Sequence, residues 1–227
     1  MLQAVLDLAL PPRCGGCADL GSWFCTSCRA RVRGLEEPLC RRCGAELSFR
    51  NAYCSCRKRL RSLSTLRSAA VYDGPLEFAL QRLKYEGRRP LAAVLARLIP
   101  ERIPLEGVAG TPLVAVPLHP HRETERGFNQ SELLARRLRV LAGFGRLAGG
   151  TLVRVRDTPP QVGLDRLSRR RNVEGAFAWR GQNLAGAPVI VLDDVTTTGA
   201  TLDACALALR RAGAGVVTGL SLARVRL

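Results

Sequence analysis

The sequence predicts an α/β protein: a parallel sheet with helices on both faces, preceded by a small cysteine-rich module. Two observations support this prediction. Eight of the nine cysteines lie before residue 57, and strand and helix patterns alternate from about residue 68 onward. At 227 residues, the chain is long enough to hold one α/β domain and a small module.

The early cysteines form four close pairs, three with two intervening residues and the last with one. In a reducing compartment such pairs indicate metal ligands rather than disulfides, and two pairs complete a tetrahedral zinc shell. The simplest assignment is a first site of Cys14, Cys17, Cys25 and Cys28 and a second of Cys40, Cys43, Cys54 and Cys56. A crossed pairing and a redox role are the alternatives. Because closed shells leave no substrate position, we expect two structural zinc ions.

The formal net charge of +16 predicts an anionic partner, which could be nucleic acid, an acidic membrane or a phosphorylated small molecule. No apolar run approaches the length of a membrane span. Residues 1–10 are apolar but lack the basic start of a signal peptide, so we expect a short N-terminal helix and a cytoplasmic protein. We divide the chain into the cysteine-rich module at 1–57, a basic linker at 58–67 and the α/β domain at 68–227.

Apolar periodicity defines the elements of the α/β domain. The expected helices cover 75–85, 91–99, 129–141 and 201–211. The expected strands cover 68–72, 114–116, 152–155, 189–192 and 216–222. The run at 189–192 is apolar throughout, which is typical of a strand buried on both faces of a parallel sheet.

The residues after that strand carry the clearest chemical signal. Asp193 and Asp194 stand where the strand should end, and a hydroxyl-rich turn with Gly199 leads into the next helix. Unpaired N–H groups at a helix N-terminus bind anions, whereas carboxylates suit sugar hydroxyls or a hydrated cation. The turn therefore predicts a ligand that carries both ribose and phosphate; a simple helix cap is the alternative.

Two polar loops are expected at the same edge of the sheet, because ligands bind beyond the carboxyl ends of parallel strands. One follows the strand at 114–116 and holds prolines, histidines, arginines and a glycine. The other, at 154–172, is long and basic, and we expect it to be a mobile lid over a polyanionic site.

Residues 189–201 resemble the phosphoribosyl-diphosphate (PRPP) binding motif of type I phosphoribosyltransferases, although Thr196 replaces an aliphatic residue common there. The whole chain is similar to the ComF family (competence protein F, GntX-like), which joins a double zinc ribbon to such a domain. Besides the cysteine pairs, the matching motifs are Lys84-Tyr85-x-Gly87, Pro117-Leu118-His119, Arg126 to Gln130, Gln161-x-Gly163-Leu164, Arg169-x-x-Asn172 and Gly175-Ala-Phe177.

The resemblance implies a type I phosphoribosyltransferase fold that binds PRPP with Mg²⁺. In it, Asp193 and Asp194 would hold the ribose hydroxyls and Arg169 would neutralise the leaving diphosphate, which makes these three the expected catalytic residues. The implied PRPP-binding residues are Asp193, Asp194, Thr196, Thr197, Thr198, Gly199, Ala200 and Thr201 in the turn, with Pro117, Leu118, His119, Arg122 and Arg126 in the pyrophosphate loop. An ordinary surface position is the alternative for His119, Arg169 and Lys84.

The resemblance also implies a function: transfer of phosphoribosyl from PRPP to an unidentified acceptor, in a family linked to DNA uptake in natural competence. Single-stranded DNA and DNA-uptake helicase proteins are the implied macromolecular partners. The alternatives are a non-catalytic protein that handles single-stranded DNA and a PRPP sensor. The aromatic content of 5% argues against extensive base stacking.

Overall fold

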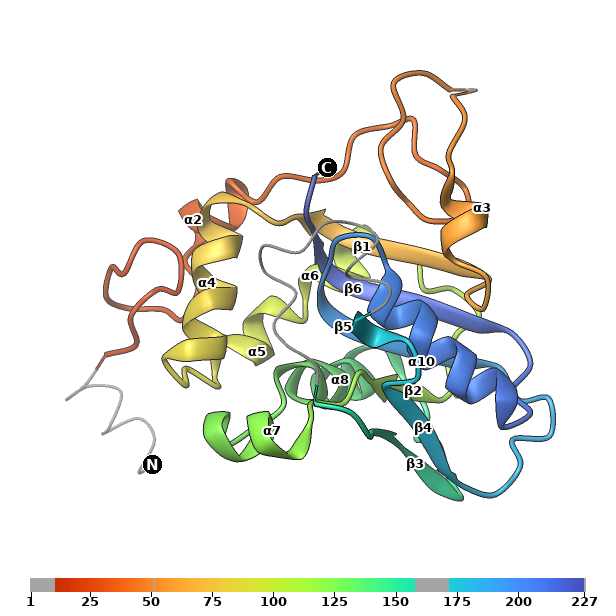
Figure 1. The fold of residues 1–227 in the computed structure, drawn as a ribbon. Coiled ribbons are helices and arrows are strands. Elements are labelled where there is room, and N and C mark those ends of the chain that lie inside the picture. Colours follow the sequence, from red (N-terminus) through yellow and green to blue (C-terminus); the bar gives the residue numbers. More distant parts are fainter. Residues whose placement is uncertain (1–10, 51, 158–171, 227) are drawn as a thin grey trace.

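The structure is a computed structural model that describes residues 11–50, 52–157 and 172–226. Its centre is a parallel sheet in the order β1-β6-β5-β2 (Figure 1). The strands are β1 (Thr65–Val71), β2 (Leu113–Ala115), β5 (Val189–Thr196) and β6 (Val217–Arg224). The predicted α/β class with a parallel sheet is confirmed.

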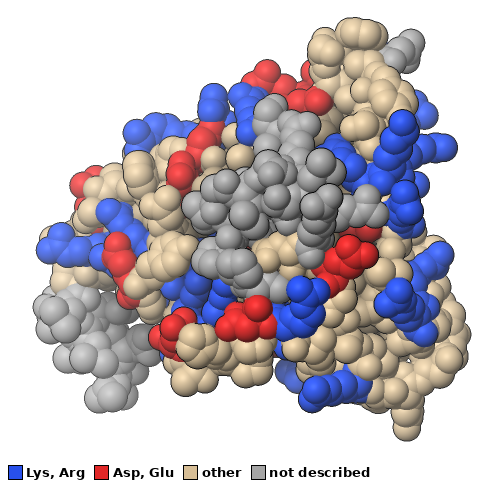
Figure 2. Space-filling model, viewed as in Figure 1, with Lys and Arg blue, Asp and Glu red and all other residues tan. Residues whose placement is uncertain are grey.

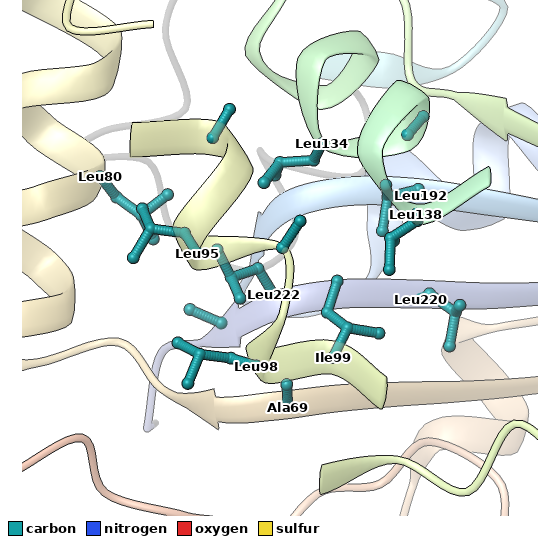
Figure 3. Close-up of a cluster of buried hydrophobic side chains, with 14 of the residues drawn as sticks. Ala69, Leu80, Leu95, Leu98, Ile99, Leu134, Leu138, Leu192, Leu220 and Leu222 are labelled. Carbon is teal, nitrogen blue, oxygen red and sulfur yellow. The ribbon is translucent and has the colours of Figure 1, made fainter. Parts of the chain in front are cut away.

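Helices cover both faces of this sheet. On one face, α4 (Gly74–Tyr85), α5 (Leu91–Leu95), α6 (Leu98–Arg102) and α8 (Gln130–Ala142) share a buried apolar cluster with the strands. Figure 3 shows Leu134 and Leu138 of α8 beside Leu192 of β5. The other face is covered by α10 (Ala200–Arg211).

Strand β5 contributes to both clusters, as its apolar sequence predicts. Ile190 and Leu192 belong to the cluster under α8, and Val189 and Val191 belong to the cluster under α10. All four side chains are buried. β5 lies between β6 and β2, so the side chains that follow Leu192 are presented by an internal strand of the sheet.

The strand at 152–155 is not part of the parallel sheet, which corrects the prediction. β3 (Gly150–Arg154) instead pairs antiparallel with β4 (Phe177–Gly181), a strand that the periodicity did not show. The backbones approach closely at one end, because a Cβ on Gly150 would lie 2.6 Å from the Gly181 Cα atom. Only Leu152 and Phe177 of these strands are buried, so the pair forms a small separate sheet against α10.

Two helical predictions also change in detail. The helix at 91–99 is two short helices, α5 and α6, because Pro100 has no N–H to donate to Ala96. The loop after β2 contains α7 (Pro120–Arg126), which ends at Gly127 in a left-handed conformation (φ 75°). Because α7 occupies part of the loop after β2, the irregular part of that loop is shorter than the sequence predicts.

The cysteine-rich module forms two knuckles that lie against different parts of the α/β domain (Figure 1). The first includes α2 (Thr26–Ala30) and contacts α4, where Arg82 donates to the Cys14 and Gly15 carbonyls (3.0 and 2.8 Å). The second includes α3 (Cys56–Arg59) and contacts the start of β1, where Leu66 N–H donates to Arg42 O (2.8 Å). None of the helices in the described ranges is long and apolar enough to cross a bilayer.

The range expected as a linker, 58–67, packs against the domain. Leu60, Leu63 and Leu66 are at most 1% exposed, and β1 already begins at Thr65. The domain boundaries stay a prediction. Basic side chains are spread over both the module and the α/β domain on the face drawn in Figure 2.

Candidate functional site

The two adjacent carboxylates lie inside β5, which continues to Thr196 rather than ending at residue 192. In the register of β5 with β6, Asp193 lies opposite Ser221 and Val195 lies opposite Ala223, so Asp194 lies between two paired positions. Asp194 is 3% exposed and Asp193 is half-buried. Both therefore sit at the carboxyl end of the central strand, where the sequence placed them.

Asp194 is held by two side chains from helices on one face of the sheet. Lys84 of α4 forms an ion pair with its Oδ2 atom, and the Gln130 side-chain amide donates to its Oδ1 atom (3.3 Å). Burial alone would raise the pKa of Asp194, but the Lys84 ammonium lowers it below its usual range. The same pair raises the pKa of Lys84 against the effect of burial. Lys84 is therefore not the ordinary surface lysine of the alternative prediction.

Asp193 has a different environment from its neighbour. The Ser131 hydroxyl (3.0 Å) and the Asp194 N–H (2.9 Å) both donate to its Oδ1 atom. Burial, followed by repulsion from the Asp194 carboxylate, raises the pKa of Asp193 to about 7. The pair thus combines a fixed carboxylate with one that exchanges its proton near neutral pH.

The turn after β5 leads directly into α10. Gly199 has a left-handed conformation (φ 82°), and a Cβ there would lie 3.0 Å from the Leu66 side chain and 3.1 Å from that of Leu60. The Ala200 N–H donates to the Thr198 hydroxyl (3.3 Å). Thr196 and Thr198 are buried, while Thr197, Ala200 and Thr201 are partly exposed. The turn is therefore tightly packed from behind and open at its helix N-terminus.

A small basic hollow of about 380 Å³ opens next to the Lys84–Asp194 pair. It is lined by Lys84, Tyr85, Gly87, Arg122, Glu125 and Arg126. The Arg126 guanidinium lies over the Tyr85 ring (5.5 Å to the centroid) and donates to Gln130 Oε1 (2.6 Å). Lys84 is paired with Asp194, and the Arg122 Nε atom lies 3.9 Å from Asp157 Oδ1. Arg126 has no ion-pair partner among the described residues, so it is the cation of this hollow best placed to meet an anion.

The other expected residues of the loop after β2 divide between two places. His119 and His121 lie near Asp157, with Nδ1 to Oδ2 distances of 3.6 and 3.4 Å. Pro117 and Leu118 line a separate hollow of about 420 Å³ between β2 and β3. The structure therefore brings Arg122 and Arg126, but not the whole loop, to the basic hollow. Arg169 and the motif at 161–164 lie outside the described residues.

Three residues of this site had no assigned role from sequence: Lys84, Gln130 and Ser131. Lys84 and Gln130 stand inside motifs shared with the ComF family, which was the available signal. Gln130 and Ser131 begin α8, which Asn129 caps by accepting from the Ser131 and Glu132 N–H groups. A helix start after an edge loop places its first side chains at the sheet edge, and that rule could have identified them.

Each predicted set of four cysteines forms one cluster. In both, the Sγ atoms lie within 4.8 Å of one another. The Sγ distances are 3.7 Å for Cys17–Cys25, 3.7 Å for Cys40–Cys56 and 3.6 Å for Cys43–Cys54. A tetrahedron with Zn–S bonds of about 2.3 Å has an edge of about 3.8 Å, so each cluster could hold a zinc ion. All nine cysteines are free of disulfides.

In each cluster the pKa of one thiol is lowered, whereas burial raises the pKa of Cys28 in the first cluster and of Cys43 and Cys56 in the second. Burial alone would raise the pKa of Cys14, but N–H donors from Cys25 and Gly16 lower it to about 6. Similar backbone donors lower the pKa of Cys40 to about 7. A thiol that ionises near neutral pH is ready to bind zinc as the thiolate.

The second cysteine cluster borders a wider hollow of about 1010 Å³. Arg41, Arg50, Arg57 and Arg67 line it together with Glu37 and Tyr53. The Tyr53 side chain is 78% exposed, and Phe49 nearby in the chain is 63% exposed. We refer to this surface, defined by Arg41, Arg50, Tyr53 and Arg57 of the lining and by the exposed Phe49 next to Arg50 in the chain, as the ribbon groove.

Comparison with known proteins agrees with this architecture. Residues 5–60 match the family model described as "Double zinc ribbon domain". The chain is 34% identical to the "DNA utilization protein YhgH" of Salmonella typhi, over 92% of this chain and 96% of that protein. It is 30% identical to "Competence protein F" of Haemophilus influenzae, over 88% and 90%. It is 28% identical to "Competence protein ComFC" of Bacillus subtilis, over 88% and 83%.

Proposed function

The chain belongs to the family that includes competence protein F and the DNA utilization protein YhgH, and on that premise we propose that it is a phosphoribosyltransferase-type protein. It would bind PRPP with Mg²⁺ at the carboxyl end of β5 and transfer the phosphoribosyl group to an acceptor. The names of these relatives link the chain to competence and DNA utilization.

One observation carries the proposal: Lys84 both forms the ion pair with Asp194 and lines the basic hollow. The site therefore combines a carboxylate pair, an open helix N-terminus after Gly199 and a cluster of cations. These three features match the three polar parts of PRPP: the ribose diol, the 5′-phosphate and the diphosphate.

In this proposal the Asp193 carboxylate accepts from the ribose hydroxyls, and the N-terminus of α10 binds the 5′-phosphate. Arg122, Arg126 and Lys84 face the diphosphate. When bound with PRPP, Mg²⁺ would neutralise part of the diphosphate charge, with few ligands supplied by the protein.

During transfer, the bond from the anomeric carbon to the diphosphate oxygen breaks, and its electron pair leaves with the diphosphate. A new bond forms from the acceptor to the same carbon. Negative charge grows on the leaving group, so the arginines at the hollow stabilise the transition state more than the ground state.

Release of pyrophosphate from PRPP and Mg²⁺ tests transfer directly. We expect release to depend on an acceptor and to fall at least a hundredfold in Arg126→Met, which removes one cation from the hollow. Arg136→Met is the matched control, because Arg136 is exposed on α8 and contacts only Glu132 among the described residues. If pyrophosphate is not released with any nucleobase, amine or nucleic-acid acceptor, transfer is contradicted, whereas PRPP binding is not.

A second candidate function is binding of single-stranded DNA, and the ribbon groove favours it. Tyr53 is an exposed aromatic side chain among the arginines that line the hollow, and Phe49, next to Arg50 in the chain, is also exposed. Among the described residues, no carboxylate lies within ion-pair distance of Arg41, Arg50 or Arg57. Exposed rings can stack on bases while unpaired arginines contact phosphates.

Fluorescence anisotropy with a labelled single-stranded oligonucleotide tests this function. Phe49→Ala with Tyr53→Ala should weaken binding about tenfold or more, since each stacked base contributes about 1–3 kcal/mol. Phe78→Ala is the control, because Phe78 is 53% exposed on α4, away from the groove. Equal affinity of the double variant and the control would remove the ribbon groove from the DNA-binding surface.

A further inference from the structure

Arg224, the last residue of β6, connects the second cysteine cluster to the turn after β5. Its Nη2 atom donates to the Cys43 carbonyl, and its Nη1 atom lies 3.5 Å from the Thr197 carbonyl. Its backbone lies opposite Thr196 in the sheet register. One side chain therefore contacts a metal-ligand residue at one end and the proposed phosphate turn at the other.

The guanidinium of Arg224 is buried without a carboxylate partner. The residue is 6% exposed, and no carboxylate among the described residues lies within ion-pair distance of it. A buried arginine stays charged and needs a compensating negative charge nearby.

The four thiolates of a zinc-loaded second cluster would supply that negative charge. Four thiolates around one Zn²⁺ carry a net charge of about −2, so the loaded cluster is an anion beside a buried cation. A guanidinium donating to the carbonyl of a ligand residue is also the kind of outer contact that orients metal ligands. The cluster and Arg224 therefore stabilise each other most strongly when the metal is present and all four thiols are ionised.

The same cluster also supports the turn through packing. Arg42 donates to the carbonyls of Leu60 (2.7 Å) and Leu63 (3.0 Å), and the Leu60 side chain lies behind Gly199. In addition, Asp203 of α10 accepts from the Ser62 and Leu63 N–H groups (both 2.9 Å). A movement of the second knuckle would therefore displace Leu60, which packs against the turn at Gly199.

We propose that Arg224 is a positioning residue that couples zinc in the second cysteine cluster to the conformation of the turn at 196–200. Zinc there and a phosphorylated ligand on the turn then bind cooperatively. The ligand part of this inference rests on the proposed function, whereas the coupling between zinc and the turn does not.

The test compares Arg224→Met with Arg226→Met. Arg226 also ties the cysteine module to the end of the chain, through Glu36 and Glu46, but it is exposed and makes no contact with the turn among the described residues. Two readouts are needed: the alkylation rate of Cys54 during chelation, and hydrogen exchange of the peptide covering 196–200. Both are followed by mass spectrometry on the full chain, with and without zinc.

In the wild type, we expect zinc removal from the second cluster to accelerate exchange at 196–200. Arg224→Met should lose zinc at roughly tenfold lower chelator concentration, and its turn should exchange fast whether zinc is present or not. Arg226→Met should keep the zinc dependence of exchange. By reciprocity, PRPP with Mg²⁺ should slow Cys54 alkylation in the wild type and not in Arg224→Met.

Exchange at 196–200 that is independent of zinc in the wild type would overturn the coupling. So would a zinc dependence that persists in Arg224→Met. If Arg224→Met does not fold, Arg224→Lys replaces it: lysine keeps the charge but cannot contact both carbonyls, so the zinc dependence should still be lost. If PRPP has no effect while zinc still changes exchange, the coupling stands and the proposed ligand is wrong.

Discussion

Lys84, near the end of α4, forms a buried ion pair with Asp194 of β5, although the two residues lie far apart in the sequence. The pair joins the helix on one face of the sheet to the carboxylates at its edge. It also leaves Asp193 as the carboxylate of the pair that can exchange its proton near neutral pH. Structure and charge at this edge therefore depend on a single lysine.

Replacing Lys84 by Met should destabilise the protein strongly. The change leaves Asp194 buried without its cation, and loss of one partner of a buried pair costs about 3–5 kcal/mol. The melting temperature should fall by roughly 10 °C for a protein of this size. Lys58→Met is the matched control because Lys58 is exposed; a similar loss in both variants would mean that the ion pair contributes little.

The raised pKa of Asp193 predicts a pH dependence of stability. The folded state holds this proton up to about pH 7, whereas the unfolded state loses it near pH 4. Between these values the folded protein binds more protons, so the contribution of Asp193 makes stability fall as pH rises, and the loss is complete above pH 7. Asp193→Asn should therefore gain stability relative to the wild type at pH 8 more than at pH 5, measured by urea unfolding. An equal difference at both pH values would contradict the raised pKa.

Gly199→Ala should disturb the turn without removing a polar group. The left-handed conformation costs an alanine about 1–2 kcal/mol, and the added Cβ would press against Leu66 and Leu60. We expect a lower melting temperature and PRPP binding weakened at least tenfold. Gly107→Ala is a control with a similar backbone conformation (φ 75°) and open space around its Cβ position. If Gly199→Ala binds PRPP as tightly as the wild type does, the turn does not contact the ligand.

Asp203 should contribute to the attachment of the segment after the second knuckle. Its carboxylate accepts from three consecutive N–H groups, at 3.2 Å from Arg61 and 2.9 Å from both Ser62 and Leu63. Asp203→Ala leaves these donors without their acceptor and should cost about 2–3 kcal/mol of unfolding free energy. Chemical denaturation measures this cost, and a change below 0.5 kcal/mol, roughly the level of an ordinary surface substitution, would refute the role.

Local signals predicted the cysteine clusters and most elements of the sheet. Pairs of cysteines that are close in sequence need only a short turn to meet, so their spacing predicted the sets that the structure gathers. The apolar run at 189–192 predicted burial on both faces because alternation was absent, and the structure confirms it. The location of Asp193 and Asp194 at the sheet edge was predicted from their position directly after that run.

Contacts between distant segments were not predictable in the same way. Nothing in the residues around Lys84 indicates that its ammonium meets Asp194, since helical periodicity describes only the buried face of α4. The pairing of β3 with β4 also depends on a close approach at Gly150 and Gly181 that no local pattern shows. Arg224 lies at the end of an apolar strand, and its contact with Cys43 requires the folded module.

Calorimetric titration with PRPP and Mg²⁺ tests the central claim most directly. We compare the wild type with Asp193→Asn, which keeps the size of the side chain and leaves the Lys84–Asp194 pair intact. Asp73→Asn controls for the change in net charge, because Asp73 pairs with Arg33 at the start of α4. The account predicts one binding event in the wild type and in Asp73→Asn, and affinity at least about thirtyfold weaker in Asp193→Asn. No binding by the wild type, or equal affinity in all three proteins, would contradict it.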